Sequence, residues 1–169
     1  RGSRRNTVDK ATDIYTDSPE WLAQNKRSTR NFIRKWGHFV MHDSLMKPIV
    51  PNKYNVAIRI KNGNKGLLHA LEPWSDYVLT DCDFNSYILE EQPNTILNLK
   101  NRIGSLDSEC SSNIIIDIDG KLFNNTDFEY IQKLSQILDD SGSIGKFNLG
   151  NLFINIKKYE TNTQNLIRL

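Results

Sequence analysis

The sequence has few cysteines and no long apolar stretch. Its two cysteines, Cys82 and Cys110, are too few for the disulfide framework of a small secreted domain, and neither lies in a C-x-x-C pair. We therefore expect two free thiols. No run approaches the about 20 apolar residues that a membrane-spanning helix needs, and no charged-then-apolar segment at the start resembles a signal peptide. These absences predict a cytoplasmic protein without a membrane span.

Several motifs of nucleophilic catalysis are also missing. The sequence contains no G-x-S-x-G motif, no phosphate-binding P-loop and no Cys/His pair. His38 and His42 have the i, i+4 spacing of two metal ligands on one helix. However, Gly37 and Val40 disfavour a helix there, and no third ligand is nearby in the sequence. The two histidines are therefore interpreted as surface or core residues.

Basic residues are concentrated toward the start of the chain. Eleven Lys or Arg and five Asp or Glu occur through Lys53, against eleven and fifteen in the remainder. A basic end can bind anionic partners, but no aromatic-interleaved RNA-binding motif accompanies it, so nucleic acid is not an expected partner. Residues 1–17 are interpreted as an extended, mobile basic arm or a cloning remnant, outside the folded domain.

Length and composition predict a single small domain. With 169 residues, of which 38% are apolar, the chain is long enough for one hydrophobic core. Ser18 and Pro19 begin a predicted helix as N-cap and first helical residue, and Gly37 ends it. With the proline-containing connection that follows, this helix makes up residues 18–53. Residues 54–169 form the predicted mixed α/β domain.

Patterns of strand and helix are interspersed in the second region. Strands are predicted at 54–61, 76–80, 86–90 and 113–119, with a hairpin at 147–159 around Gly150 and Asn151. Helices are predicted at 65–71 and from a capping box at 126–129 to Gly142. This arrangement predicts an α/β or α+β fold, in which helices pack on a mixed sheet.

The clearest chemical signal is the segment DYVLTDCDF, residues 76–84, which ends a predicted strand with Asp81 and Asp83. An N-x-G turn at Asn64 and Gly66 and a short helix precede it. This arrangement resembles the metal-binding segment of GT-A glycosyltransferases, especially those of family 2. The resemblance implies a nucleotide-sugar donor, a substrate-binding turn at Asn64 and Gly66, and Mn²⁺ or Mg²⁺ held by Asp81 and Asp83. Such cations prefer carboxylate oxygens and neutralise a diphosphate leaving group.

Other interpretations of these residues remain open. Asp81 and Asp83 can instead cap a turn, because aspartate side chains readily accept hydrogen bonds from nearby backbone amides. Trp74 is assigned to substrate binding because an indole can stack on a sugar or base. A tryptophan beside a proline can equally pack in the core.

A second acidic pair, Asp117 and Asp119, lies in the segment IIIDIDGKLF. The segment resembles the opening motif of haloacid dehalogenase-type phosphatases, in which the first aspartate is the nucleophile and the second a general acid. Here Lys121 replaces the threonine of that motif, and only about fifty residues follow. Asp117 and Asp119 are therefore interpreted as strand-end and turn residues.

The sequence thus supports two functional hypotheses. The first is a fragment or accessory domain of a metal-dependent glycosyltransferase that uses a nucleotide-sugar donor, with Asp81 and Asp83 holding the ion. The second is a non-enzymatic α+β interaction or structural module that binds a protein partner within a larger assembly. In the second hypothesis the basic start of the chain is an extended arm.

Overall fold

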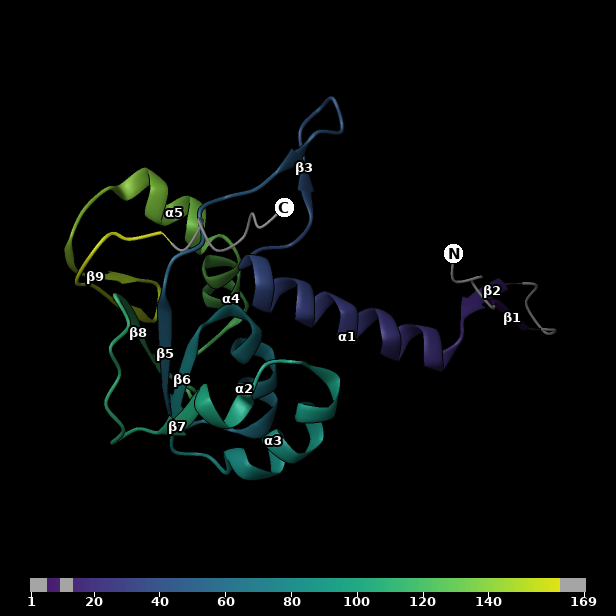
Figure 1. Cartoon of the computed structure of the whole chain (residues 1–169), viewed down its shortest axis with the longest axis horizontal. Helices are drawn as coiled ribbons and strands as arrows, with labels where there is room; N and C mark the ends of the chain where they lie inside the picture. Colours follow the sequence, from purple (N-terminus) through teal and green to yellow (C-terminus); the bar gives the residue numbers. More distant parts are fainter. Residues whose placement is uncertain (1–5, 10–13, 162–169) are drawn as a thin grey trace.

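Helices cover one face of a central sheet (Figure 1). The computed structural model describes residues 6–9 and 14–161. Within these residues, the helices are α1 (Pro19–Trp36), α2 (Lys65–Leu71), α3 (Phe84–Glu91), α4 (Asn125–Gln132) and α5 (Leu134–Ser141). The main sheet contains β5 (Val56–Lys61), β6 (Tyr77–Thr80), β7 (Ile103–Ser105), β8 (Ile114–Asp119), β9 (Gly145–Leu149) and β10 (Leu152–Ile156). The predicted single α+β domain with a mixed sheet is confirmed.

Four neighbouring strands of the main sheet are parallel. The order across the sheet is β7-β6-β5-β8-β10-β9, and β5 pairs in parallel with both β6 and β8. Strand β10 is antiparallel to β8 and to β9, so the last two strands form a hairpin at one edge. Numbered along the chain, the parallel strands have the order 3-2-1-4, as in the first four strands of doubly wound α/β sheets.

The two faces of the sheet differ because successive side chains of a strand point to opposite faces. Ile58 of β5 and Ile116 of β8 lie side by side in register and are fully buried beneath the helices. The next positions along the strands carry Arg59 and Asp117, and Phe153 of β10 is paired in register with Asp117. The sheet therefore has an apolar, helix-covered face and a second face with exposed charged and aromatic side chains, which we call the open face.

The chain between β7 and β8 runs along the open face, on the side of the sheet away from α2 and α3 (Figure 1). It has to pass β6 and β5, because β7 is an edge strand and β8 lies beyond β5. A methyl group placed on Gly104 would be 3.1 Å from Ser108 Oγ and 3.3 Å from Leu79 Cδ2. The connection therefore packs closely over β6 and β7 and leaves the polar side chains of β5, β8 and β10 accessible.

Buried ion pairs attach α1 to the rest of the domain. Arg34 Nη2 lies 2.6 Å from Glu72 Oε2 and 2.8 Å from Glu91 Oε1. Arg30 Nε donates to Glu91 Oε1 at 2.8 Å, and Arg102 Nη1 lies 2.9 Å from Glu72 Oε1. Two buried carboxylates are thus paired with three guanidinium groups, which compensates for their removal from water.

Most of the predicted elements are confirmed. Ser18 Oγ accepts a hydrogen bond from Trp21 N at the start of α1, and Gly37 ends the helix with a φ of 79°. Helix α2 has the predicted bounds. The strands predicted at 54–61, 76–80 and 113–119 are present as β5, β6 and β8, and the predicted hairpin is β9 and β10. Cys82 and Cys110 are free thiols, as expected.

The strand predicted at 86–90 is wrong, because this segment is helix α3. Asp83 accepts hydrogen bonds from the amides of Asn85 and Ser86, which starts the helix. Tyr87 and Glu91, which are four residues apart, are both buried on the side of the helix that faces the core. The periodicity is therefore helical, although the segment contains several residues that favour strands.

The capping box lies two residues before its predicted position. Asn124, and not Thr126, is the N-cap of α4, and Asp127 is its reciprocal partner. The helix that follows is interrupted at Lys133, which separates α4 from α5, and Gly142 ends α5 as predicted. The capping box can form two residues earlier because Asn124 is as good an N-cap as threonine and Asp127 is an acid three residues after it.

Two short strand pairs lie outside the main sheet. Strands β3 (Met41–His42) and β4 (Pro48–Ile49) form a hairpin within the predicted connection after α1. Strands β1 (Asn6–Asp9) and β2 (Ile14–Asp17) pair beyond the N-terminal end of α1, far from the main sheet (Figure 1). They fall within the predicted arm at 1–17, of which residues 1–5 and 10–13 lie outside the described part of the chain.

Candidate functional site

Asp81 binds the backbone of the neighbouring loop with both carboxylate oxygens. Its Oδ2 accepts a hydrogen bond from Asn62 N at 2.7 Å, and its Oδ1 accepts one from Gly63 N at 2.8 Å. These bonds, first of all the one from Gly63, hold the pKa of Asp81 below its usual value. They also support the unusual backbone of Asn62, which has a φ of 53°. Asp81 therefore joins the end of β6 to the loop after β5.

Asp83 and Asn64 cap helices. Asp83 Oδ1 accepts from Asn85 N at 3.0 Å and from Ser86 N at 3.4 Å, and Asn64 Oδ1 accepts from Leu67 N at 2.9 Å. The side chains predicted to bind metal and substrate are thus engaged by backbone donors, which is the geometry of the turn-capping alternative. A cation held by Asp81 and Asp83 would have to replace some of these hydrogen bonds.

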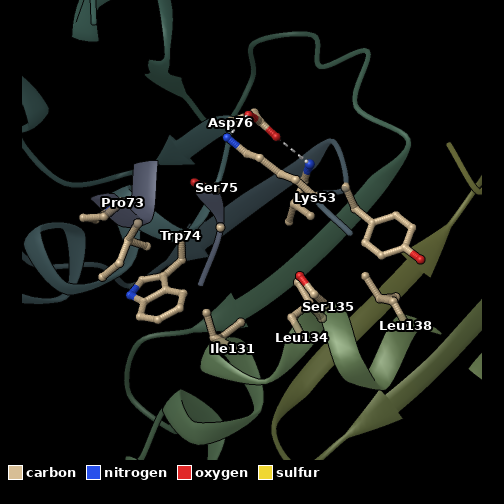
Figure 2. A pocket seen from close by; sticks show the side chains of 13 residues that line it. Lys53, Pro73, Trp74, Ser75, Asp76, Ile131, Leu134, Ser135 and Leu138 are labelled. Carbon is tan, nitrogen blue, oxygen red and sulfur yellow. Dashed lines mark hydrogen bonds and ion pairs between the residues drawn. The ribbon is translucent and has the colours of Figure 1, made fainter. Parts of the chain in front are cut away.

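Trp74 packs in the core, where it is 8% exposed. Its ring lies edge-on to Phe39 and Phe128, with centroids 4.9 Å and 6.1 Å away. Figure 2 shows Trp74, Ile131 and Leu134 around a small cavity with a volume of about 20 Å³. Such a cavity holds about one water molecule. Of the two interpretations, packing in the core is the one that matches this position.

Gly66 permits a close approach of the Asn64 side chain at the start of α2. A methyl group placed on Gly66 would be 3.2 Å from Asn64 Oδ1, the atom that caps the helix. The N-x-G turn therefore has a local structural explanation. A role in substrate binding for Asn64 and Gly66 stays a prediction.

A polar pocket of about 340 Å³ opens on the open face near the carboxyl ends of β5 and β8. We call it the β5–β8 pocket. Two cationic and two anionic side chains contribute to it, together with an amide and three apolar residues. Its lining consists of Arg59, Lys61, Leu106, Asp117, Ile118, Asp119, Asn151 and Phe153. Asp117 and Asp119 reach the same pocket because they are two residues apart on one strand.

The loops after β5 and β8 are pressed together beside this pocket. Asp119 Oδ1 accepts hydrogen bonds from Asn62 Nδ2 and from Lys121 N, both at 3.0 Å. These bonds, first of all the one from Lys121, lower the pKa of Asp119. A methyl group placed on Gly120 would be 2.5 Å from Asn62 O, so only glycine fits there. Asp119 is therefore held ionised at a tight junction of two loops.

The other charged side chains of the pocket are accessible to solvent. Arg59 Nη1 lies 3.2 Å from Asp117 Oδ1, and the two side chains are 43% and 37% exposed. Lys61 is also exposed. An exposed pair of this kind contributes little to stability and is readily rearranged by a charged ligand. The pocket can therefore offer cations to an anionic group and a carboxylate to a cation.

Comparisons with known proteins do not assign a family. No family model, curated protein or solved structure matches the chain significantly. Among the described residues, no three His, Cys, Asp or Glu side chains are grouped so that they could hold a metal ion by themselves. Across the same part of the chain, no helix combines the length and apolar character required to cross a membrane.

The β5–β8 pocket contains a different acidic pair from Asp81 and Asp83, which the sequence interpretation favoured as metal ligands. Asp117 and Asp119 do lie at a strand end and beside a turn, as predicted, but they also line the β5–β8 pocket. The signal for this was present in IIIDIDG, because two acids with strand spacing face the same way. Asn151 and Phe153 had no comparable signal, since their contribution depends on β10 lying next to β8.

Proposed function

We propose that the domain binds a nucleotide sugar in the β5–β8 pocket, as part of a metal-dependent glycosyltransferase. The observation that carries the proposal is the position of this pocket. It combines Arg59, Lys61 and Asp119 at the carboxyl ends of β5 and β8, where the strand order reverses. In open α/β sheets with helices on both faces, ligands bind in the crevice outside the carboxyl ends of the strands at such a reversal, and this pocket lies beside that position.

The pocket lies on the open face for a topological reason. Helices α2 and α4, which follow β5 and β8, both pack on the helix-covered face, where His69 and Phe128 line a common groove. The two loops therefore press together at Gly120 and do not separate to form a crevice. Accessible polar groups are left on the opposite side, where the connection between β7 and β8 contributes Leu106 to the rim.

The charges of the pocket suit a diphosphate accompanied by a divalent cation. Arg59 and Lys61 can bind phosphate oxygens, and Asp119 Oδ1 already accepts two hydrogen bonds, which leaves Oδ2 as the oxygen to offer. Mg²⁺ in nucleotide sites is commonly held by one or two carboxylates together with substrate phosphates. This donor set fits an ion that arrives with the nucleotide, and it does not require three protein ligands. The ion would neutralise charge on the departing diphosphate.

A thermal-shift experiment with UDP and GDP, each with and without Mn²⁺, tests the proposal. A ligand at 100 times its Kd stabilises a protein by about 2.7 kcal/mol, which raises the Tm of a chain of this size by about 5 to 10 °C. We expect this rise with one diphosphate and Mn²⁺ together, and only a small change with Mn²⁺ alone. An unchanged Tm with every combination would contradict the proposal.

Substitutions distinguish the two possible metal ligands. Asp119→Asn should abolish the Mn²⁺-dependent part of the shift, whereas Asp140→Asn, an exposed acid on α5, should leave it unchanged. If Asp83→Asn abolishes the shift and Asp119→Asn does not, the ion binds at the D-x-D segment after β6. That result would move the site but keep the nucleotide-sugar hypothesis.

The β3–β4 hairpin supports a second candidate function, a non-enzymatic interaction module. At its tip, Asp43 Oδ1 accepts from Leu45 N and Lys47 N at 2.8 Å and 2.9 Å. The side chains of Leu45 and Met46 are presented to solvent at 73% exposure each. If the domain functions in an assembly, residues 38–51 of the protein isolated with its partners should resist proteolysis and become cleavable in the isolated chain. Equal cleavage in both would exclude the hairpin as a contact.

A further inference from the structure

A buried carboxylate fixes the position of Asn151 at the edge of the β5–β8 pocket. Asp127, which is 1% exposed, accepts hydrogen bonds from Asn151 N at 2.9 Å and from Asn151 Nδ2 at 3.0 Å. Asn151 Nδ2 also donates to Leu122 O at 3.1 Å. The preceding Gly150 makes this contact possible, because a methyl group there would be 2.5 Å from Asp127 Oδ1. The turn between β9 and β10 is thereby anchored to the start of α4.

These contacts also settle the orientation of the amide. An asparagine NH₂ group has two hydrogens, and both face acceptors, one on Asp127 and one on Leu122. A flipped amide would direct its oxygen at a carboxylate and a carbonyl, which is unfavourable. Asn151 Oδ1 is therefore the amide atom that the side chain offers to the pocket, and it is a preorganised hydrogen-bond acceptor.

Phe153 supplies an accessible aromatic surface beside this acceptor. It belongs to the open face, because the adjacent Leu152 and Ile154 of β10 are buried on the other face. Asn151, in the turn just before β10, lines the same pocket. The Phe153 ring is 39% exposed and is paired in register with Asp117. The ring therefore offers an apolar surface to the pocket, beside the Asn151 acceptor and the Asp117 carboxylate.

We infer that Asn151 and Phe153 bind the hexopyranose of the nucleotide sugar, an inference that rests on the proposed function. One face of a pyranose ring presents C–H groups that pack on an aromatic ring, and its hydroxyl groups donate to fixed amide and carboxylate oxygens. Asn151 Oδ1 and Asp117 supply such acceptors near Phe153. Lys61 and Asp119, at the β5 and β8 end, are left for the diphosphate and its ion. A pocket of about 340 Å³ is at the small end of ligand sites, which suits this part of the donor and leaves the nucleoside outside.

Calorimetric titrations that compare each diphosphate with its sugar conjugate test the inference. The probes are UDP against UDP-glucose and GDP against GDP-mannose, all with Mn²⁺. In the wild-type protein, the sugar should tighten binding by about 2- to 10-fold for at least one pair, the range expected for one aromatic contact. Phe153→Ala should remove this gain and leave the affinity for the diphosphate unchanged. Phe153→Tyr should keep it.

The matched control is Tyr77→Ala, which removes an exposed aromatic ring of the same sheet away from the pocket, and it should keep the full gain. A gain that survives in Phe153→Ala, or is absent from the wild-type protein, overturns the inference and leaves the proposed function intact. If neither UDP nor GDP binds, the proposed function fails, and NMR with methyl glucoside and methyl mannoside decides the inference. Shifts of the Asn151 side-chain amide and the Phe153 ring support a sugar site, and their absence overturns it.

Discussion

Charged side chains are buried and paired on the helix-covered side of the sheet, whereas those on the open face are more exposed to solvent. Beneath α1, the carboxylates of Glu72 and Glu91 are buried and bound by Arg30, Arg34 and Arg102. On the open face, the charged groups are exposed and incompletely engaged. The comparison shows that strongly perturbed ionisable groups do not by themselves mark a site, because the groups of this buried network are bound to one another.

The buried network has a structural explanation. Burial alone would lower the pKa of Arg34, but its bonds to Glu72 and Glu91 raise it, so the guanidinium stays charged. Burial and the Glu72 charge raise the pKa of Tyr87, whose hydroxyl donates to Glu72 Oε2 at 2.9 Å. Each of these charged or polar groups forms an ion pair or a hydrogen bond with another member of the network. The network therefore fixes α1 to α3 and the segment before β6, whereas the β5–β8 pocket keeps groups available.

The largest expected effect is the loss of one partner from the buried network. Arg34→Met removes one of the two guanidinium partners from each of the buried carboxylates, which leaves Glu72 with Arg102 and Glu91 with Arg30 and costs about 3 to 5 kcal/mol of unfolding free energy. Arg59→Met removes the equivalent partner of Asp117 on the open face and should cost less than about 1 kcal/mol. Urea denaturation of the two variants measures the difference directly.

The comparison would break if the two variants lost similar amounts of stability. The double variant Arg34→Met/Glu72→Leu tests whether buried charge is the cause of the stability loss. If the cost of Arg34→Met comes from incompletely compensated buried charge, removing Glu72 as well should restore part of the lost stability. No restoration would mean that packing of the Arg34 side chain, and not its charge, is what holds α1.

An intermediate effect is expected where the two loops meet beside the pocket. In Gly120→Ala, the new methyl group would be 2.5 Å from the backbone oxygen of Asn62, which cannot rotate away. Such overpacking costs about 1 to 3 kcal/mol. The displacement should also move Asp119 and weaken binding of the diphosphate with Mn²⁺. Chemical denaturation and calorimetry together check this, and an unchanged stability would show that the loops separate more easily than their contacts indicate.

Local chemistry explains how much of the fold could be predicted from the sequence. The Ser18 cap, the Gly37 stop and the apolar run of β8 are each decided by a few neighbouring residues, and each was predicted correctly. Helix α3 was misassigned because residues 86–90 combine strand-favouring residue types with helical spacing. In that segment the position of the Asp83 cap, three residues earlier, outweighs intrinsic strand preference.

The candidate site was less predictable because it is assembled across strands. Asp81 and Asp119 both follow an apolar strand and cannot be told apart by local pattern. Both contact the loop after β5, and the sheet order separates them: Asp81 accepts from the backbone amides of that loop, whereas Asp119 lies beside Lys61 of β5 and accepts from the Asn62 side chain. The position of the Asn151 side chain depends on its hydrogen bonds to Asp127, which belongs to helix α4. Such contacts follow from topology, which one sequence does not contain.

The smallest expected effect concerns pH. Burial alone would raise the pKa of Glu91, but hydrogen bonds from Arg30 and Arg34 lower it below its usual value of 4.5. A carboxylate with a depressed pKa in the folded state stabilises the protein above its unfolded pKa, and this contribution disappears as the pH falls through the folded value. We therefore expect the unfolding free energy of the wild-type protein to decrease below about pH 4.5. The advantage of wild type over Glu91→Gln should shrink over the same range.

Salt separates this contribution from that of the open face. Glu91 and Arg34 are buried and Arg30 is half-buried, so 1 M NaCl should leave the acid-dependent difference between wild type and Glu91→Gln largely unchanged, because screening acts mainly on exposed charges. Asp119 also has a depressed pKa, but it is only partly buried, and its difference from Asp119→Asn should be smaller. Urea denaturation at pH 3.0 to 6.0 in low and high salt measures both differences. If the Glu91 difference vanished in salt, its ion pairs would behave as surface pairs, and the contrast between the two sides of the sheet would not hold.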